Sequence, residues 1–149
     1  MAELDRLYSE KIIEIAANPP PAPRLAAPQA SARKVSRICG SAIEVDIAVE
    51  GGVFAQYGHS VSACALGQTS AAIVAARIVG TKVADFRALR AAMHAMLKEG
   101  GAPPEGRWAE LGYLEPVRDF PNRHGSTLLV FDAVAEALEK IESSQTVGA

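Results

Sequence analysis

The sequence predicts one α+β domain, because its strand patterns are grouped together and its helical patterns occupy the remainder. Residues 43–50 alternate apolar and polar side chains, which predicts a half-buried strand. Residues 62–79 are nearly all small or aliphatic, and this run is too long for a strand, so it predicts a buried helix. Strands that are grouped and then followed by several helices are typical of an α+β fold rather than of alternating βα units.

The N-terminal part is predicted to be a helix and a connector, over residues 1–32. Apolar side chains recur at helical spacing, which predicts an amphipathic helix over residues 4–17. The run Asn18-Pro19-Pro20-Pro21 would end this helix. The following stretch, to about Ala32, is rich in Pro and Ala and predicts an extended connector over the surface.

An antiparallel sheet of about three strands is expected next. Gly51-Gly52 follows the strand at 43–50 and is typical of a two-residue hairpin loop. Residues 53–57 would then return as the second strand of the hairpin. Residues 34–39 are a candidate third strand that precedes the hairpin.

Two helices are predicted after the sheet. The buried helix at 62–79 would end near Gly80, a residue that commonly ends helices. An amphipathic pattern over residues 83–97 predicts the next helix, which Gly100-Gly101 would end.

The C-terminal part is expected to hold a short helix and a long one. Residues 108–114 are a candidate short helix after a loop, and Ser126 is expected to be the N-cap of the last helix. The globular domain is therefore placed at residues 33–142. Residues 143–149 are expected to form a flexible tail.

Composition excludes several classes of protein. The chain has 149 residues, a formal net charge of −2 and a pI near 5.9, so bulk charge does not draw it to nucleic acid or anionic lipid. Its first residues carry no apolar signal sequence, and no apolar run approaches the roughly 20 residues that span a bilayer. We therefore expect a cytoplasmic protein with no transmembrane segment. Its cysteines would remain reduced there, so a disulfide between them is not expected.

The two cysteines are the main candidates for chemistry. Cys39 ends a strand pattern and precedes a turn, and Cys64 lies at the start of the buried helix, where unpaired backbone N–H groups favour a thiolate. His124 and Ser126 lie near the expected start of another helix. If these segments converge, two thiols and an imidazole would bind a metal. Two inert core cysteines are the alternative from spacing alone.

Three short motifs carry a resemblance to a known family. They are Ile38-Cys39-Gly40, Cys64-Ala-Leu-Gly-Gln-Thr-Ser-Ala71 and Val117-Arg-Asp-Phe-Pro-Asn-Arg123. In this order and spacing, the chain resembles the NifU N-terminal/IscU/SufU family of iron–sulfur cluster assembly scaffolds, from about Leu7 to Leu138. The long stretch between the second and third motifs is similar to the SufU branch.

The resemblance implies an IscU/NifU-like fold, with helices packed on one face of the sheet, and a ligand set. Cys39 and Cys64 would be metal ligands and sulfur acceptors. The family's aspartate ligand falls on Ser41 and its third cysteine on Ser126, so two of four ligands are replaced by serine. Serine hydroxyls are poor ligands for zinc or iron–sulfur clusters, and His124 is a candidate third ligand.

The resemblance also implies a function and partners. The protein would be a scaffold rather than an enzyme and would bind iron, an iron–sulfur cluster or zinc. A cysteine desulfurase would supply sulfur to it, and acceptor apoproteins would take its product. The two serines favour an alternative, in which the fold is retained as a structural or accessory subunit of a larger multiprotein assembly without a working cluster site.

Overall fold

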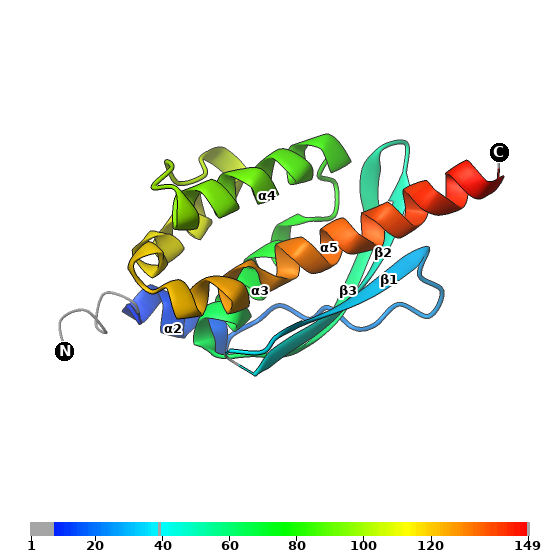
Figure 1. Cartoon of the computed structure of the whole chain (residues 1–149). Coiled ribbons are helices and arrows are strands. Elements are labelled where there is room, and N and C mark those ends of the chain that lie inside the picture. The colour runs from blue at the N-terminus through cyan, green and yellow to red at the C-terminus, as the bar shows by residue number, and fades with distance from the viewer. Residues whose placement is uncertain (1–7, 39, 149) are drawn as a thin grey trace.

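A computed structural model describes residues 8–38 and 40–148. It contains a three-stranded antiparallel sheet with the helices on one face, which confirms the predicted α+β class (Figure 1). Cys39 and the predicted start of the first helix lie outside the described residues.

The sheet has the strand order β1-β2-β3, with β2 in the centre. The strands are β1 (Ala30–Ser36), β2 (Ser41–Glu50) and β3 (Val53–Ser62). Gly51 and Gly52 join β2 to β3 with φ angles of 59° and 76°, in the left-handed region that favours glycine. The buried side chains of Ile43, Val45 and Ile47 in β2 alternate in sequence, and so share one face of the sheet.

The third strand is five residues longer than the predicted one, which ended at Tyr57. Gly58, which is typical of a break, instead pairs with Asp46 inside the β2–β3 ladder. A Cβ on Gly58 would lie 2.2 Å from the carbonyl oxygen of Pro23, so the glycine lets the connector pass against the strand. The first strand also begins earlier than predicted, at Ala30 rather than Lys34, because its residues pair with β2 as far as Ile47.

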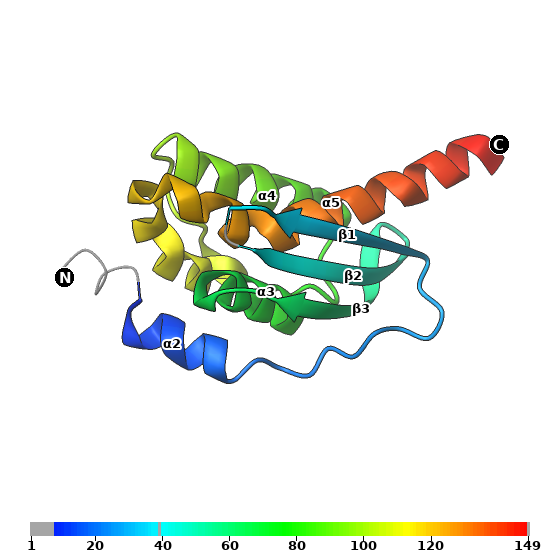
Figure 2. The ribbon, with the colours of Figure 1, turned by 60° about the horizontal axis from the view of Figure 1, so that its bottom comes forward.

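The helices cover one face of the sheet, and α5 packs along β1 and β2 (Figures 1 and 2). Their bounds are α2 (Glu10–Ala17), α3 (Ala65–Arg77), α4 (Val83–Lys98), the 3₁₀ helix η1 (Gly106–Asp119) and α5 (Pro121–Gly148). No helix in the described part of the chain is both long and apolar enough to cross a membrane.

The last helix begins five residues before the predicted N-cap. Pro121 is its first residue, a position where the fixed φ of proline suits a helix and its missing N–H costs nothing. Ser126 is therefore not an N-cap but lies in the second turn, with no exposed surface. The helix also continues through Gly148, so residues expected in a flexible tail are helical and extend past the sheet (Figure 2).

Aromatic side chains join the layers of the core. The Phe86 ring, on α4, lies 5.5 Å from Phe54 on β3 and 5.9 Å from Phe131 on α5, measured between ring centroids. Trp108 on η1 contacts the same ring at 6.2 Å. One side chain of α4 thus packs against the sheet, α5 and η1, which fixes the helical layer.

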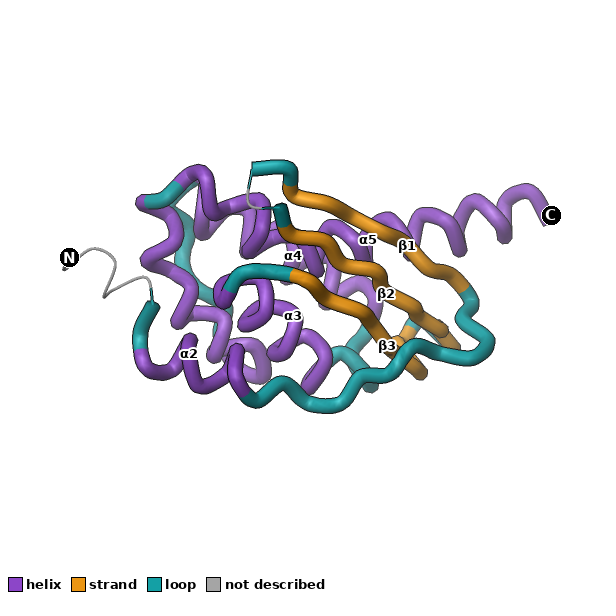
Figure 3. Tube along the Cα trace, turned by 90° about the horizontal axis from the view of Figure 1, so that it is seen from below, coloured by secondary structure: helices purple, strands orange, loops and turns teal. Residues whose placement is uncertain are grey.

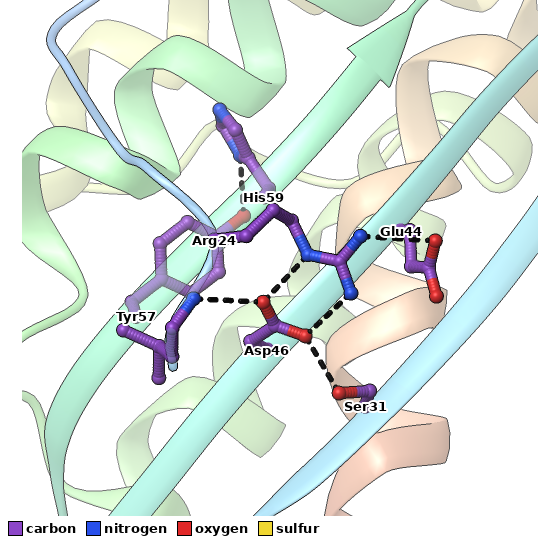
Figure 4. A network of polar contacts seen from close by, with 7 residues as sticks. Arg24, Ser31, Glu44, Asp46, Tyr57 and His59 are labelled. Carbon is purple, nitrogen blue, oxygen red and sulfur yellow. Dashed lines mark hydrogen bonds and ion pairs between the residues drawn. The ribbon is translucent and has the colours of Figure 1, made fainter. Parts of the chain in front are cut away.

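The connector between α2 and β1 is held on the opposite face of the sheet. It runs beside β3 and then turns into β1 (Figure 3). Arg24 donates two hydrogen bonds to the buried carboxylate of Asp46, at 2.6 and 2.9 Å, and the Leu25 N–H and Ser31 hydroxyl donate two more (Figure 4). The connector is therefore fixed to the central strand by a satisfied buried charge.

Candidate functional site

Three segments that are distant in sequence meet near one end of the sheet. The turn between β1 and β2 lies beside the loop that leads from β3 into α3 (Figure 3). Ser41 is the first residue of β2, and Cys64 is the N-cap residue of α3. Ser126, from the second turn of α5, contacts both of these side chains. Three of the five residues predicted for the site are therefore brought together.

Ser126 is the central member of this cluster. Its hydroxyl oxygen lies 2.9 Å from the hydroxyl oxygen of Ser41 and 3.2 Å from the sulfur of Cys64. Both serines are fully buried, whereas Cys64 is half-buried. The cluster is thus a hydrogen-bonded row of two hydroxyls and one thiol, and the thiol is the member nearest to solvent.

The close approach of α3 and α5 at this point depends on a glycine. A Cβ on Gly67, in the first turn of α3, would lie 2.8 Å from the Ser126 hydroxyl oxygen and 2.8 Å from the Ala63 side chain. Such distances are shorter than carbon atoms tolerate, so any side chain would displace the Ser126 hydroxyl or push the two helices apart. Gly67 therefore allows the Ser126 hydroxyl to reach Cys64.

The surroundings of Cys64 favour its thiolate. Burial opposes ionisation, but the hydrogen bond from Ser126 and the nearby backbone N–H groups of Gly67 and Leu66 outweigh it, and the charge of Arg123 adds to them. The pKa of the Cys64 thiol is therefore lowered from its ordinary value. This agrees with the expected effect of a helix N-terminus on a thiol.

His124 is directed at the 3₁₀ helix. Its Nε2 atom lies 3.0 Å from the carbonyl oxygen of Val117 and 3.2 Å from that of Arg118. A nitrogen that faces two carbonyl oxygens must carry a proton, so Nε2 donates here and is not available to a metal in this conformation. The imidazole instead ties the start of α5 to the end of η1.

The described side chains offer a poor metal site. Within residues 8–38 and 40–148, no three His, Cys, Asp or Glu side chains are grouped so that they could hold a metal ion. The Cys64 thiol is a good ligand for zinc or iron, whereas the hydroxyls of Ser41 and Ser126 are neutral near pH 7. Cys39, the other predicted thiol ligand, lies outside the described residues.

Sequence analysis missed the part that backbone and packing contribute to the site. The N–H groups of Leu66 and Gly67 act on the thiol, and Gly67 also provides the space for Ser126. A glycine in the first turn of an otherwise well-formed helical pattern is the signal that could have indicated this close approach.

Solved structures resemble this chain over nearly its whole length. A NifU-like protein (N-terminal) from Brucella abortus is 45% identical, with a TM-score of 0.92, over 95% of this chain and 98% of that one. A putative iron–sulfur cluster assembly scaffold protein for the SUF system from Fervidobacterium islandicum is 17% identical, with a TM-score of 0.81, over 90% of this chain and 98% of that one. The second likeness shows a shared fold alone.

A third solved structure, a hypothetical protein, is 18% identical with a TM-score of 0.79, over 91% of this chain and 98% of that one. No protein-family model matches the chain, and no curated protein matches it either.

Proposed function

Because this chain belongs to the family of NifU-like N-terminal proteins, we propose that it is a scaffold on which iron–sulfur clusters are assembled. Identity of 45% across 95% of the chain supports the family, and the shared fold supports a function of assembly and transfer rather than turnover of a small substrate. The iron–sulfur cluster is cargo in this proposal, not a resident cofactor.

One observation carries the proposal for the site. Ser41, Cys64 and Ser126 come from three segments up to 85 positions apart, yet their side-chain atoms are joined by contacts of 2.9 and 3.2 Å. The cluster includes a half-buried thiol whose pKa is lowered, and such a thiol is a suitable nucleophile and metal ligand. The contacts among these three of the five expected ligand positions support a site here.

We assign the chemistry first to the cysteines. Cys64, and Cys39 by family resemblance, would bind iron, a cluster or zinc and would accept sulfur. Ser41, Ser126 and His124 are weaker candidate ligands, since two are neutral hydroxyls and the Nε2 of the third is hydrogen-bonded to backbone carbonyl oxygens.

The proposed partners are a cysteine desulfurase, as sulfur donor, and acceptor apoproteins. Both must reach the half-buried thiol of Cys64. Ile38, in the turn between β1 and β2, is 78% exposed, and Val35 on β1 is 49% exposed. Exposed apolar side chains near a reactive group are typical of a surface that partners contact.

The first test is the content of metal and acid-labile sulfide per chain in protein purified without oxygen. Wild type is compared with Cys39→Ser and Cys64→Ser, and Ser143→Ala, an exposed position on α5, is the control. We expect iron with sulfide, or zinc, at near one site per chain in the wild type and the control, and its loss in both cysteine variants.

A folded wild type that stays free of metal and sulfide, even after incubation with iron and a desulfurase, would contradict the proposal. The second candidate function would then apply: an accessory subunit of a larger assembly that retains the fold without a cluster. The two buried serine hydroxyls at ligand positions favour this alternative.

A further inference from the structure

The hydrogen bonds of the cluster have a fixed direction when Cys64 is a thiolate. A thiolate only accepts hydrogen bonds, so the Ser126 hydroxyl must donate its single proton to the sulfur at 3.2 Å. Ser126 then has only acceptor capacity left for Ser41, whose oxygen lies at 2.9 Å, so Ser41 must donate to Ser126. The row therefore runs from Ser41 through Ser126 to the sulfur.

Both hydroxyls are buried and so have no water to replace these partners. Ser126 has no exposed surface and Ser41 has 1%. Each donation polarises the next hydroxyl, so a hydrogen-bonded row holds its final acceptor more firmly than one hydroxyl would. The backbone N–H groups of Leu66 and Gly67, in the first turn of α3, also favour the thiolate.

We propose that Ser126 and Ser41 are positioning residues for sulfur transfer to Cys64, and not metal ligands. Ser126 holds the sulfur directly, and Ser41 acts only through Ser126. This inference rests on the proposed function, and specifically on Cys64 as sulfur acceptor. It assigns a role to the two serines that differs from the ligand role expected from their places in the sequence.

The transfer step needs only a persulfide donor, R–S–SH. The Cys64 thiolate attacks the outer sulfur of the donor and forms a new S–S bond. The S–S bond of the donor breaks, and its electron pair leaves with the inner sulfur as R–S⁻. Cys64 becomes Cys64–S–SH, the outer sulfur keeps its proton, and no further oxidant or reductant is consumed.

The test measures sulfur uptake by a single thiol. In a Cys39→Ser background, full-length protein is mixed with glutathione persulfide, and the gain in mass of one sulfur atom is followed by intact-mass spectrometry. The variants are Ser126→Ala, Ser41→Ala, the double variant and Ser41→Thr, with Ser143→Ala as control. Urea unfolding of each variant establishes that it is folded.

We expect Ser126→Ala to slow uptake about fivefold or more, because a hydrogen bond to the nucleophile is lost. Ser41→Ala should slow uptake less, and its effect should disappear in the Ser126→Ala background, because Ser41 acts through Ser126. Ser41→Thr retains the hydroxyl, so it should take up sulfur at the wild-type rate. Equal rates in all variants, or effects of the two alanine variants that simply add, would overturn the proposal.

Metal content of the serine variants separates positioning from ligation. For this measurement the serine variants are made in the wild-type protein, with both cysteines present. If the wild type binds metal and either serine-to-alanine variant loses it, the serine is a ligand and the proposal is wrong. Unchanged content together with slower sulfur uptake supports it.

Alkylation by iodoacetamide separates this inference from the proposed function, because it needs no sulfur donor. A wild type that accepts no sulfur from glutathione persulfide or a desulfurase contradicts the sulfur-accepting function. The alkylation rate of Ser126→Ala should still differ several-fold from that of the wild type. Ser41→Ala should change the alkylation rate when Ser126 is present, but not in the Ser126→Ala background. If both serine variants are alkylated at the wild-type rate, the hydrogen-bonded row does not act on the thiol, and the inference is overturned.

Discussion

Arg24 and Asp46 are joined by two hydrogen bonds, of 2.6 and 2.9 Å, across the face of the sheet opposite the helices (Figure 4). Arg24 belongs to the connector and Asp46 to the central strand. Asp46 has no exposed surface, and in the part of the chain that the structure describes its side chain accepts hydrogen bonds from the connector and from β1. The pair therefore attaches the α2 end of the chain to the sheet whose other face supports the site.

Loss of this carboxylate should destabilise the fold. Asp46→Ala removes the acceptor of four hydrogen bonds. The N–H of Leu25 and the hydroxyl of Ser31 then lose the carboxylate to which they donate. We expect the free energy of unfolding to fall by about 2–3 kcal/mol, measured from urea titrations. Glu44→Ala is the control: this side chain is 40% exposed and pairs with the same arginine, and it should change stability by less than about 1 kcal/mol. Similar losses in both variants would contradict a special role for Asp46.

Stability should depend on pH through the same residue. Hydrogen bonding to Arg24 outweighs the effect of burial and holds the pKa of Asp46 at about 2, below its ordinary 3.8. Because the pKa is lower in the folded state, the stabilisation is complete above the unfolded value and is lost as pH falls from about 4 to about 2. The loss should be about 2 kcal/mol in the wild type. Asp46→Asn should lack this part of the pH dependence, and parallel stability curves for the two proteins would contradict the assignment.

A side chain at Gly58 should release the connector. The nearest atom to a Cβ there is the Pro23 carbonyl oxygen at 2.2 Å, which is backbone and cannot rotate away. We expect Gly58→Ala to expose the bond after Arg24 to trypsin, with cleavage faster by about tenfold or more because local opening becomes easier. Gly112→Ala is the control, because a Cβ there would lie 3.4 Å from its nearest neighbour, the Pro103 side chain, and trypsin should cleave this variant at the wild-type rate. Unchanged cleavage in Gly58→Ala would show that the connector tolerates the displacement.

A side chain at Gly67 should disturb the site itself. Gly67→Ala places a Cβ 2.8 Å from the Ser126 hydroxyl oxygen and 3.2 Å from the Ser126 carbonyl oxygen, so the hydroxyl must move away or α3 and α5 must separate. We expect a loss of about 1–2 kcal/mol in unfolding free energy, after the better helix propensity of alanine is included. Sulfur uptake by Cys64 should slow along with it, whereas the matched Gly112→Ala should change neither quantity. A stable Gly67→Ala protein with normal uptake would mean that the contact between Gly67 and Ser126 is not needed.

Local patterns predicted much of the fold, and they failed where a distant segment decided the outcome. The alternation at 43–50 and the Gly51-Gly52 turn are local signals, and β2 and its hairpin are where they predict. The strand predicted over residues 53–57 stops before Gly58, because the sequence does not show that Pro23 packs against this glycine. The start of α5 at Pro121 was missed because Ser126 looked like a cap, whereas Ser126 is buried against Ser41 and Cys64.

The sequence by itself determined the α+β class and the central hairpin, since these depend on local periodicity and turn residues, and its short motifs predicted the candidate site residues. Only the tertiary structure decided what those residues do together. It placed the Ser126 hydroxyl between Ser41 and Cys64 and directed the Nε2 of His124 to backbone carbonyl oxygens. The physical reason is that hydrogen bonds and close packing depend on distances between segments far apart in the chain, and no local pattern records those distances.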